Sequence, residues 1–222
     1  MNQDLTQIVI YYATKPHKEL NQLLLNKSKD NLISSLTDLL TAYINDKNSS
    51  SLREFITVII SGYQHNPKKL GYNGFKQNST IGGKPIACEA KPKNIQTDGY
   101  AERKTKPKLN GEGGFNDYTI ERLKKDAKES LNLLSSGFID GELQYIIEFP
   151  FSVVHNQLKK QLPRQRTIGT YTRMASFNFS HYGGYPKIKI VYLNKPAIEK
   201  NRKYFNKNFY LFLIKHKQWK NT

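Results

Sequence analysis

Hydrophobic residues recur at spacings of three and four along the first part of the chain. One group consists of Leu20, Leu23 and Leu24. A second group consists of Leu32, Leu36, Leu39, Leu40 and Tyr43, and a third of Leu52, Phe55, Ile56, Ile59 and Ile60. A polar, Ser-rich stretch over 45–51 separates the last two groups. This periodicity predicts amphipathic helices, the last of which ends at Gly62.

The pattern changes toward extended chain after residue 70. An aromatic segment over 70–75, a Gly82-Gly83 turn and an apolar segment over 85–91 predict a β-hairpin. The next stretch, 91–114, is rich in Lys, Pro, Gly and Thr and has few aliphatic residues. We predict a long surface loop there, and loops of that length in compact domains are usually functional or disordered.

The second half of the chain alternates between helical and extended patterns. Residues 117–132 predict a helix with Thr119 as its N-cap. Asp140-Gly141, a favoured two-residue hairpin turn, separates two predicted strands over 133–139 and 143–149. The remaining predicted elements are a short helix after Pro150, aromatic-rich strands over 170–182 and 187–193, and a basic segment ending in 209–214.

Composition indicates one domain and a polyanionic partner. A chain of 222 residues with 37% hydrophobic content is long enough for one sizeable core, so we expect a single domain over 1–222. Lys and Arg number 35 against 18 Asp and Glu, which gives a formal net charge of +17. Such an excess favours binding to nucleic acid. On charge alone, DNA, RNA and a merely Lys-rich surface remain equal alternatives.

The cysteine and hydropathy patterns indicate a reducing compartment. The single cysteine, Cys88, has no partner for an internal disulfide, and no Cys/His tetrad shows zinc-finger spacing. The apolar run from Ile8 to Ala13 is too short to span a membrane and lacks the flanks of a signal peptide. We therefore expect a soluble, cytoplasmic protein with no membrane partner.

One short motif carries candidate phosphodiester chemistry. Glu89 and Lys91 lie two residues apart on a predicted strand, so their side chains share one face. A carboxylate that holds Mg²⁺, with a lysine beside it, suits phosphodiester cleavage, and the Ala90 carbonyl would add a neutral oxygen ligand. The alternative is an exposed ion pair, which is common in a Lys-rich chain. The apolar strand that leads into the motif and the partner strand ending at 72–75 favour the active-site interpretation.

In this setting the chain resembles the PD-(D/E)xK nucleases. Members of that superfamily carry an acidic residue on one hairpin strand and the Glu-x-Lys motif on the next, and Asn73 and Glu89 have the corresponding separation. The resemblance covers roughly 52–149. It implies an α/β fold with a mixed central β-sheet flanked by helices, Mg²⁺ as cofactor, and DNA as substrate.

Asn73 departs from that pattern, because the superfamily has Asp at this position. An amide oxygen can contact a metal ion but adds no negative charge. Either another carboxylate substitutes for it, or the chain is a catalytically impaired Asp-to-Asn form, native or engineered. The best substitute is Glu54, since some members contribute a helical Glu, although a solvated helix-face residue is the simpler interpretation. The predicted active site is therefore Glu54, Asn73, Glu89 and Lys91, with Asn73, Glu89 and Ala90 as metal ligands.

Two basic segments are candidate DNA-binding elements. The first supplies lysines suited to phosphates, and the second supplies Arg and Gln suited to base edges. Solvated surface charge is an equal alternative for each segment. Asn116 follows Gly113-Gly114 and is a further candidate, although a helix-entry turn explains it equally well. The candidates are Lys93, Arg103, Lys104, Lys106, Asn116, Arg164, Gln165, Arg166 and Arg173.

The resemblance is most specific to type II restriction endonucleases. It implies site-specific cleavage of duplex DNA by a homodimer, with a helical region over 1–51, a catalytic core over 52–149 and a DNA-reading or dimerisation region over 150–222. It also implies a cognate DNA methyltransferase encoded nearby. The alternatives are a repair or structure-specific nuclease and a non-enzymatic DNA- or RNA-binding protein.

Overall fold

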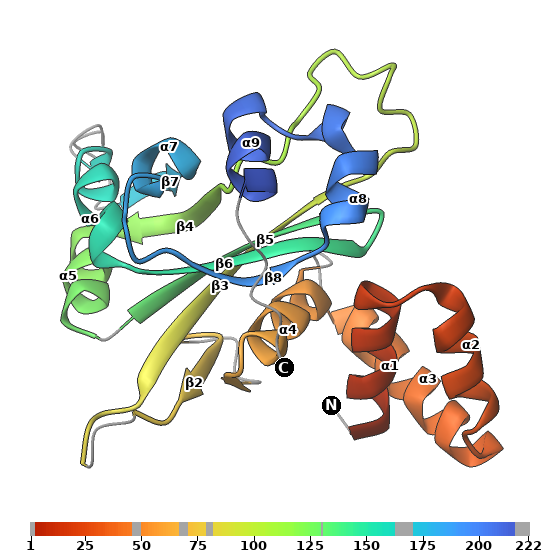
Figure 1. Ribbon diagram of the computed structural model, residues 1–222. Coiled ribbons are helices and arrows are strands. Elements are labelled where there is room, and N and C mark those ends of the chain that lie inside the picture. Colours follow the sequence, from red (N-terminus) through yellow and green to blue (C-terminus); the bar gives the residue numbers. More distant parts are fainter. Residues whose placement is uncertain are drawn as a thin grey trace.

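The computed structural model describes residues 3–45, 50–66, 71–78, 82–129, 131–162 and 171–215. It shows an α/β fold, as the sequence predicts, in which helices flank a central β-sheet (Figure 1). The six-stranded sheet has the order β1-β2-β3-β5-β6-β8. Only β3 and β5 pair in parallel, so the sheet is mixed and mostly antiparallel. Its strands are β1 (Gln64–His65), β2 (Gly74–Lys76), β3 (Ile86–Ile95), β5 (Leu131–Ile139), β6 (Glu142–Pro150) and β8 (Lys189–Leu193).

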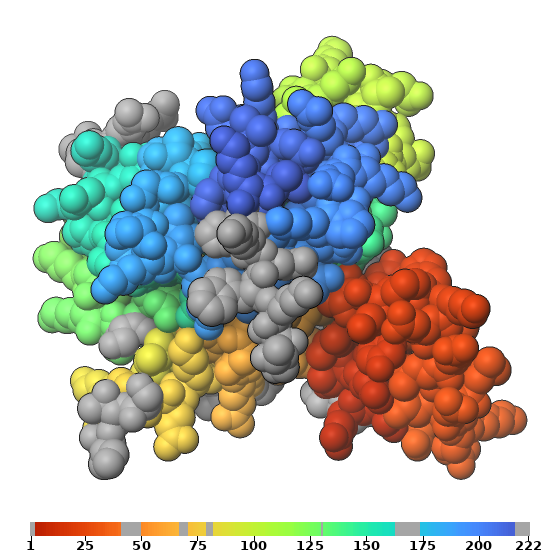
Figure 2. Space-filling model, in the orientation of Figure 1, coloured from red at the N-terminus to blue at the C-terminus, as the bar shows by residue number. Residues whose placement is uncertain are grey.

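Four helices precede the sheet, at the positions where the periodicity predicts helix. They are α1 (Gln3–Thr14), α2 (His17–Leu25), α3 (Lys29–Asn45) and α4 (Ser51–Ile60). The stripe that packs against the sheet was not predicted, because it belongs to α1: Leu5, Val9 and Ala13 are buried in a cluster with Ile146 of β6. In Figure 2 these helices form a lobe at one side of the molecule.

The predicted stripe on α3 is only partly buried. Leu39 packs against the α1 cluster, whereas Leu36 and Leu40 are 56% and 50% exposed. Likewise, no residue of α2 is buried. The physical reason is that α3 has apolar residues around two edges of its surface and only one edge meets another element. Periodicity identified the helix but not the side that is covered.

The strand β3 is longer than predicted. It continues to Ile95, so the predicted loop over 91–114 is wrong for its first five residues. The parallel pairing with β5 runs along the whole strand and includes Pro92 opposite Ser136. On its other side, β3 pairs with β2 only as far as Cys88. Because Pro92 lies beyond that point, its missing N–H group is tolerated as at a sheet edge.

The β5–β6 hairpin matches its prediction closely. Both turn residues have positive φ, 48° at Asp140 and 84° at Gly141, as a type I′ turn requires. The Asp140 carboxylate also accepts a hydrogen bond from the backbone N–H of Thr97 at 2.8 Å. The turn therefore connects the end of β3 to the hairpin beside it.

A separate two-stranded sheet was not predicted. It pairs β4 (Gly113–Thr119) with β7 (Tyr171–Phe177) in antiparallel fashion. The predicted helix over 117–132 is correspondingly shorter, because α5 spans Ile120–Lys128 and Leu131 already belongs to β5. Thr119 is its N-cap, as predicted, and its Oγ1 accepts a hydrogen bond from the Arg122 N–H at 3.1 Å.

The remaining helices and β4–β7 cover the face of the sheet opposite α4 (Figure 1). They are α6 (Ser152–Lys159), α7 (Phe179–Tyr182), α8 (Lys195–Lys200), the 3-10 helix η2 (Arg202–Tyr204) and α9 (Lys207–Lys215). The predicted strand over 170–182 thus ends at Phe177 and turns into α7. The core on this face is aromatic, with Phe149 stacked on Tyr182 at a centroid distance of 4.1 Å. Among the described helices, none is long and apolar enough to cross a membrane.

Candidate active site

Strand β3 places Glu89 and Lys91 as the sequence predicts. Their side chains share one face, and Lys91 Nζ lies 2.9 Å from Glu89 Oε1. The Lys91 ammonium also lies 4.2 Å from the ring centroid of Phe115 on β4, a cation–π contact. The two charged side chains are only 16% and 11% exposed. Such burial is unlike the exposed ion pair that was the simpler interpretation of this tripeptide.

The Glu89 carboxylate has one oxygen without a hydrogen bond. Within the described residues, Oε2 of Glu89 is buried and makes no hydrogen bond. Burying an unsatisfied charged oxygen costs free energy, and buried polar groups are normally paired. A hard cation would satisfy this oxygen, so the donor set here fits Mg²⁺. The described residues contain no group of three or more His, Cys, Asp or Glu that could hold a metal ion. A magnesium site would therefore need backbone, amide or substrate oxygens as well.

Asn73 connects the Glu-x-Lys strand to α4. It directly precedes β2, whose register places Gly74 opposite Cys88. The Asn73 Oδ1 accepts a hydrogen bond from the Ala90 N–H at 2.8 Å, and its Nδ2 donates to Glu54 Oε2 at 3.2 Å. The site therefore includes Glu54, the residue that the sequence offered as a substitute carboxylate. The Asn73 amide contacts Ala90 and Glu54 and makes no hydrogen bond to Glu89 within the described part of the chain.

Five of the predicted residues line one cleft of about 460 Å³. These are Glu54, Ala90, Lys91, Lys93 and Asn116. One wall comes from the first turn of α4 and from β3, and the other from β4, β7 and the start of α7. Glu89 is not among the lining residues and reaches the cleft through its contact with Lys91. Residues that the sequence did not indicate also line it: Ser50, Pro92, Glu112, Gly113, Gly114, Met174, Ser176, Phe177 and Asn178.

Gly113 allows β4 to approach the Glu-x-Lys strand. A Cβ atom at this position would lie 2.8 Å from Lys91 Cβ and 2.4 Å from Phe177 Cζ, both too close for a real contact. Only glycine fits where the two backbones approach so closely. The Gly113-Gly114 pair, visible in the sequence, thus has a structural role in forming the cleft.

Lys93 also lies on this face of β3 but is paired inside the protein. It forms an ion pair with Glu112, and burial lowers the pKa of its ammonium group below the ordinary value. The predicted phosphate-binding role of Lys93 therefore competes with an internal partner. Glu112 would have to release it for a phosphate to bind.

The other predicted DNA-binding residues do not all reach the cleft. Arg103, Lys104 and Lys106 lie in the 96–112 loop and are not among the lining residues. That loop packs near the C-terminal helices, where Tyr100 makes an edge contact with Tyr204. Arg164, Gln165 and Arg166 lie outside the described residues. Arg173 lies on β7, but its side chain also falls outside what the structure describes.

A buried aspartate beside the site was not predicted. Asp126 on α5 is fully buried, and its carboxylate accepts hydrogen bonds from Tyr72 Oη at 3.0 Å, Tyr118 Oη at 2.7 Å and Arg122 Nε at 2.9 Å. Burial and the nearby Asp126 carboxylate raise the pKa of both tyrosine hydroxyls. Because Tyr72 precedes Asn73 and Tyr118 ends β4, Asp126 connects both sides of the site to α5. In the sequence, Asp126 resembles an ordinary i,i+4 partner of Arg122.

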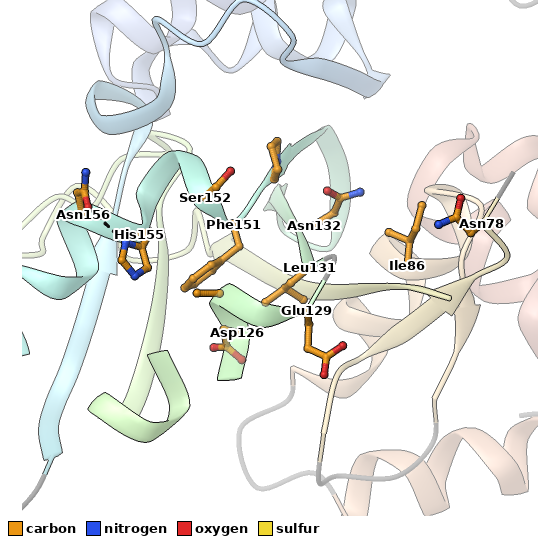
Figure 3. Close-up of a pocket in the computed structure, with 12 residues that line it drawn as sticks. Asn78, Ile86, Asp126, Glu129, Leu131, Asn132, Phe151, Ser152, His155 and Asn156 are labelled. Carbon is orange, nitrogen blue, oxygen red and sulfur yellow. Dashed lines mark hydrogen bonds between the residues drawn. The ribbon is translucent and has the colours of Figure 1, made fainter. Parts of the chain in front are cut away.

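A second, larger cavity of about 670 Å³ lies elsewhere (Figure 3). Its lining includes Asp126, Glu129, Asn132 and His155. Two of these polar groups are already engaged: Asp126 as described, and Asn132, whose Nδ2 donates to Glu148 Oε1 and Tyr63 Oη at 2.9 Å each. The cavity contains none of the predicted active-site residues. The smaller cleft is therefore the better candidate site.

Comparisons with known proteins leave the family open. No family model matches the chain. No curated protein matches it either.

Proposed function

We propose that this protein is a magnesium-dependent nuclease that cleaves phosphodiester bonds in double-stranded DNA. The observation that carries the proposal is the buried Glu89–Lys91 pair, with one carboxylate oxygen unpaired, beside a cleft that also receives Glu54. The net charge of +17 supports a polyanionic substrate. Hydrolysis of a phosphodiester needs charge neutralisation and an activated water, and this combination of groups suits both.

Each group has a distinct role in the proposed reaction. Glu89 and Glu54, with the Ala90 carbonyl and the Asn73 amide, are the groups that would hold Mg²⁺. When bound, Mg²⁺ supplies charge neutralisation at the phosphate and lowers the pKa of a water molecule. Lys91 places a positive charge beside the scissile phosphate and orients the attacking water. Asn73 acts as a positioning residue, because its amide fixes the Glu54 carboxylate against β3.

The finer part of the proposal is that cleavage is site-specific, as in type II restriction endonucleases. A homodimer would match a palindromic DNA site and supply one active site per strand. Such an enzyme requires a cognate DNA methyltransferase to protect the host genome, so its gene should lie nearby. A repair nuclease or a nucleic-acid-binding protein has no such requirement.

The N-terminal helices offer the surface for a homodimer. Residues 1–49 contain five Lys and five Asp or Glu, so the whole charge of +17 falls on residues 50–222. On α3, Ile33, Leu36 and Leu40 are each at least half exposed and follow one another at helical spacing. Two chains of high positive charge can approach with least repulsion through a neutral, apolar face. We propose that a second copy of the chain packs on this face.

Incubation of unrelated plasmids with the protein and magnesium tests the proposed function. Reproducible discrete fragments would support site-specific cleavage. Cutting confined to junctions, flaps or damaged sites would instead favour a structure-specific nuclease. If DNA binds and remains intact with both magnesium and manganese, the nuclease proposal fails and the protein is a binding module.

A further inference from the structure

One wall of the cleft is the outer face of the β4–β7 sheet. Side chains along these strands alternate, with Phe115, Ala175 and Phe177 buried on the inner face. The outer face carries Gly114 and Asn116 on β4 and Ser176 and Met174 on β7, paired across the strands as Gly114↔Ser176 and Asn116↔Met174. All four residues of this outer face line the cleft. The sheet is thus a two-stranded ribbon that faces the Glu-x-Lys wall.

A local backbone distortion exposes the end of β4. Asp117 has a positive φ of 48°, an uncommon conformation for a residue other than glycine. The strand register is the same on both sides of it, with Asn116 opposite Met174 and Tyr118 opposite Thr172. The distortion nevertheless interrupts the alternation: Asn116 and Asp117 are both exposed, and Tyr118 is buried with its hydroxyl on Asp126. Asn116 is therefore held outward by the buried tyrosine that follows it.

Two side chains of the outer face are unusual for a surface strand. Met174 is 58% exposed, although its long apolar side chain would normally be buried. In the described parts of the chain, the side chain of Asn116 makes no hydrogen bond, so both its donor and its acceptor can bind a ligand. Gly114 leaves room beside Met174, since a Cβ there would come within 3.5 Å of the Met174 sulfur. The face thus offers an amide and an apolar group side by side.

We infer that the outer face of β4–β7 reads base edges of duplex DNA, with Asn116 contacting an adenine and Met174 packing against a thymine methyl group. This inference rests on the proposed function. A two-stranded β-ribbon fits the major groove, where Asn can bind both N6 and N7 of adenine and apolar groups contact the thymine methyl. Gly113, at the start of the ribbon, packs against Lys91. A duplex in the cleft would therefore present its backbone to Lys91 and its base edges to the ribbon.

Selection from a pool of duplexes with a randomised central segment tests this inference. Binding is measured with calcium in place of magnesium for the parent, Asn116→Ala, Asn116→Asp and Met174→Ala. We expect the parent to select a consensus that contains A·T pairs. Asn116→Ala should lose one adenine preference, weakening binding to the parent's site about five- to 150-fold. Asn116→Asp should shift that position toward cytosine, whose N4 amino group a carboxylate accepts from. Met174→Ala should relax a thymine position.

Matched controls separate base reading from folding and from phosphate binding. Asn31→Ala and Leu211→Ala change an exposed Asn and an exposed apolar residue that do not line the cleft. They should leave the consensus unchanged. All variants should keep the parent's melting temperature and its salt dependence on DNA of unselected sequence. The shift toward cytosine in Asn116→Asp is a gain that misfolding cannot produce.

Three outcomes would overturn the inference. If Asn116→Ala and Asn116→Asp select the parent's consensus, the ribbon does not read bases. If the parent binds and cuts DNA without any base preference, the inference fails while the proposed nuclease stands. If the parent neither binds nor cuts duplex DNA, the proposed function fails first and the inference falls with it.

Discussion

Asn73 donates a hydrogen bond from its side-chain amide to Oε2 of Glu54, at 3.2 Å. The same amide accepts from the Ala90 N–H at 2.8 Å, so it acts as donor and acceptor at once. Aspartate at this position could accept from Ala90 but could not donate to Glu54. The sequence alone made Asn73 look like the loss of a metal ligand. The contacts favour a second interpretation, in which Asn73 positions Glu54 and Glu54 supplies the second carboxylate.

Asn73→Asp tests how this site depends on metal. Without metal, two carboxylates would face each other and a donor would be lost, so we expect the variant to unfold more easily by about 1–3 kcal/mol. Magnesium should offset that loss, because it binds between paired carboxylates. Thermal denaturation with and without magnesium should therefore show a larger stabilisation by metal in Asn73→Asp than in the parent. Cleavage by the variant should also rise.

Asn73→Ala is the matched control for that experiment. It removes the donor to Glu54 without adding charge, so it should destabilise the protein without increasing the effect of magnesium. Equal stabilisation of the parent, Asn73→Asp and Asn73→Ala by magnesium would remove Asn73 from the metal site. Glu54→Gln would then decide whether α4 contributes to catalysis.

Glu148 should make stability depend on pH in the acid range. Burial by itself would raise the pKa of this carboxyl, but hydrogen bonds from Tyr63 and Lys76 outweigh it and lower the pKa below the ordinary value. A lowered pKa stabilises the fold above the unfolded-state pKa of about 4.3, and the contribution is lost as pH falls through the folded value. Glu148→Gln should therefore be less stable than the parent at neutral pH and lose less stability on acidification. Urea unfolding at several pH values measures this, and parallel pH profiles would contradict it.

Binding to duplex DNA should weaken steeply with salt. Each neutralised phosphate contributes a log–log slope of about −0.9, so a dimer contacting on the order of 6–10 phosphates should lose roughly a thousandfold in affinity between about 50 and 200 mM salt. Fluorescence anisotropy with a labelled duplex measures the slope. If Lys104 and Lys106 contact phosphates despite lying outside the cleft, each change to Ala should reduce the slope by about one. A flat salt response in the parent would point away from nucleic acid.

Leu36→Glu tests the dimer surface on α3. Leu36 is 56% exposed at the centre of the apolar stripe, so a buried charge there should prevent association. Light scattering after size-exclusion chromatography should report a dimer for the parent and a monomer for Leu36→Glu. Asn31→Glu adds the same charge to an exposed position on another side of α3 and should remain a dimer. A monomeric parent would remove this face from the proposal.

Local patterns predicted the elements whose signal lies within a short segment. The Asp140-Gly141 turn and the Thr119 cap were correct because backbone geometry at these positions depends mainly on the residues themselves. Glu89 and Lys91 share a face because side chains on a strand alternate. These features need no knowledge of the tertiary fold.

Other features depend on partners far away in the sequence. The pairing of β4 with β7 joins segments more than fifty residues apart, and nothing in the pattern around Gly113 or Tyr171 specifies that partner. The burial of Asp126 depends on Tyr72, which a helix pattern does not reveal. The exposed stripe on α3 was misjudged because periodicity reports apolar residues, not what covers them. The contact between Asn73 and Glu54 was likewise visible only in the fold.

The most direct test of the proposed nuclease compares the parent with Glu89→Gln and Lys91→Met on duplex DNA. Cleavage is measured with magnesium, and binding is measured separately with calcium. Each change should slow cleavage on the order of a thousandfold, since several kcal/mol of charge stabilisation are lost and each ~1.4 kcal/mol is tenfold in rate. Binding should stay within a few-fold, and the loop variants Glu102→Gln and Lys108→Met should cut like the parent. Parental cleavage rates in Glu89→Gln and Lys91→Met, or no cleavage by the parent, would contradict the account.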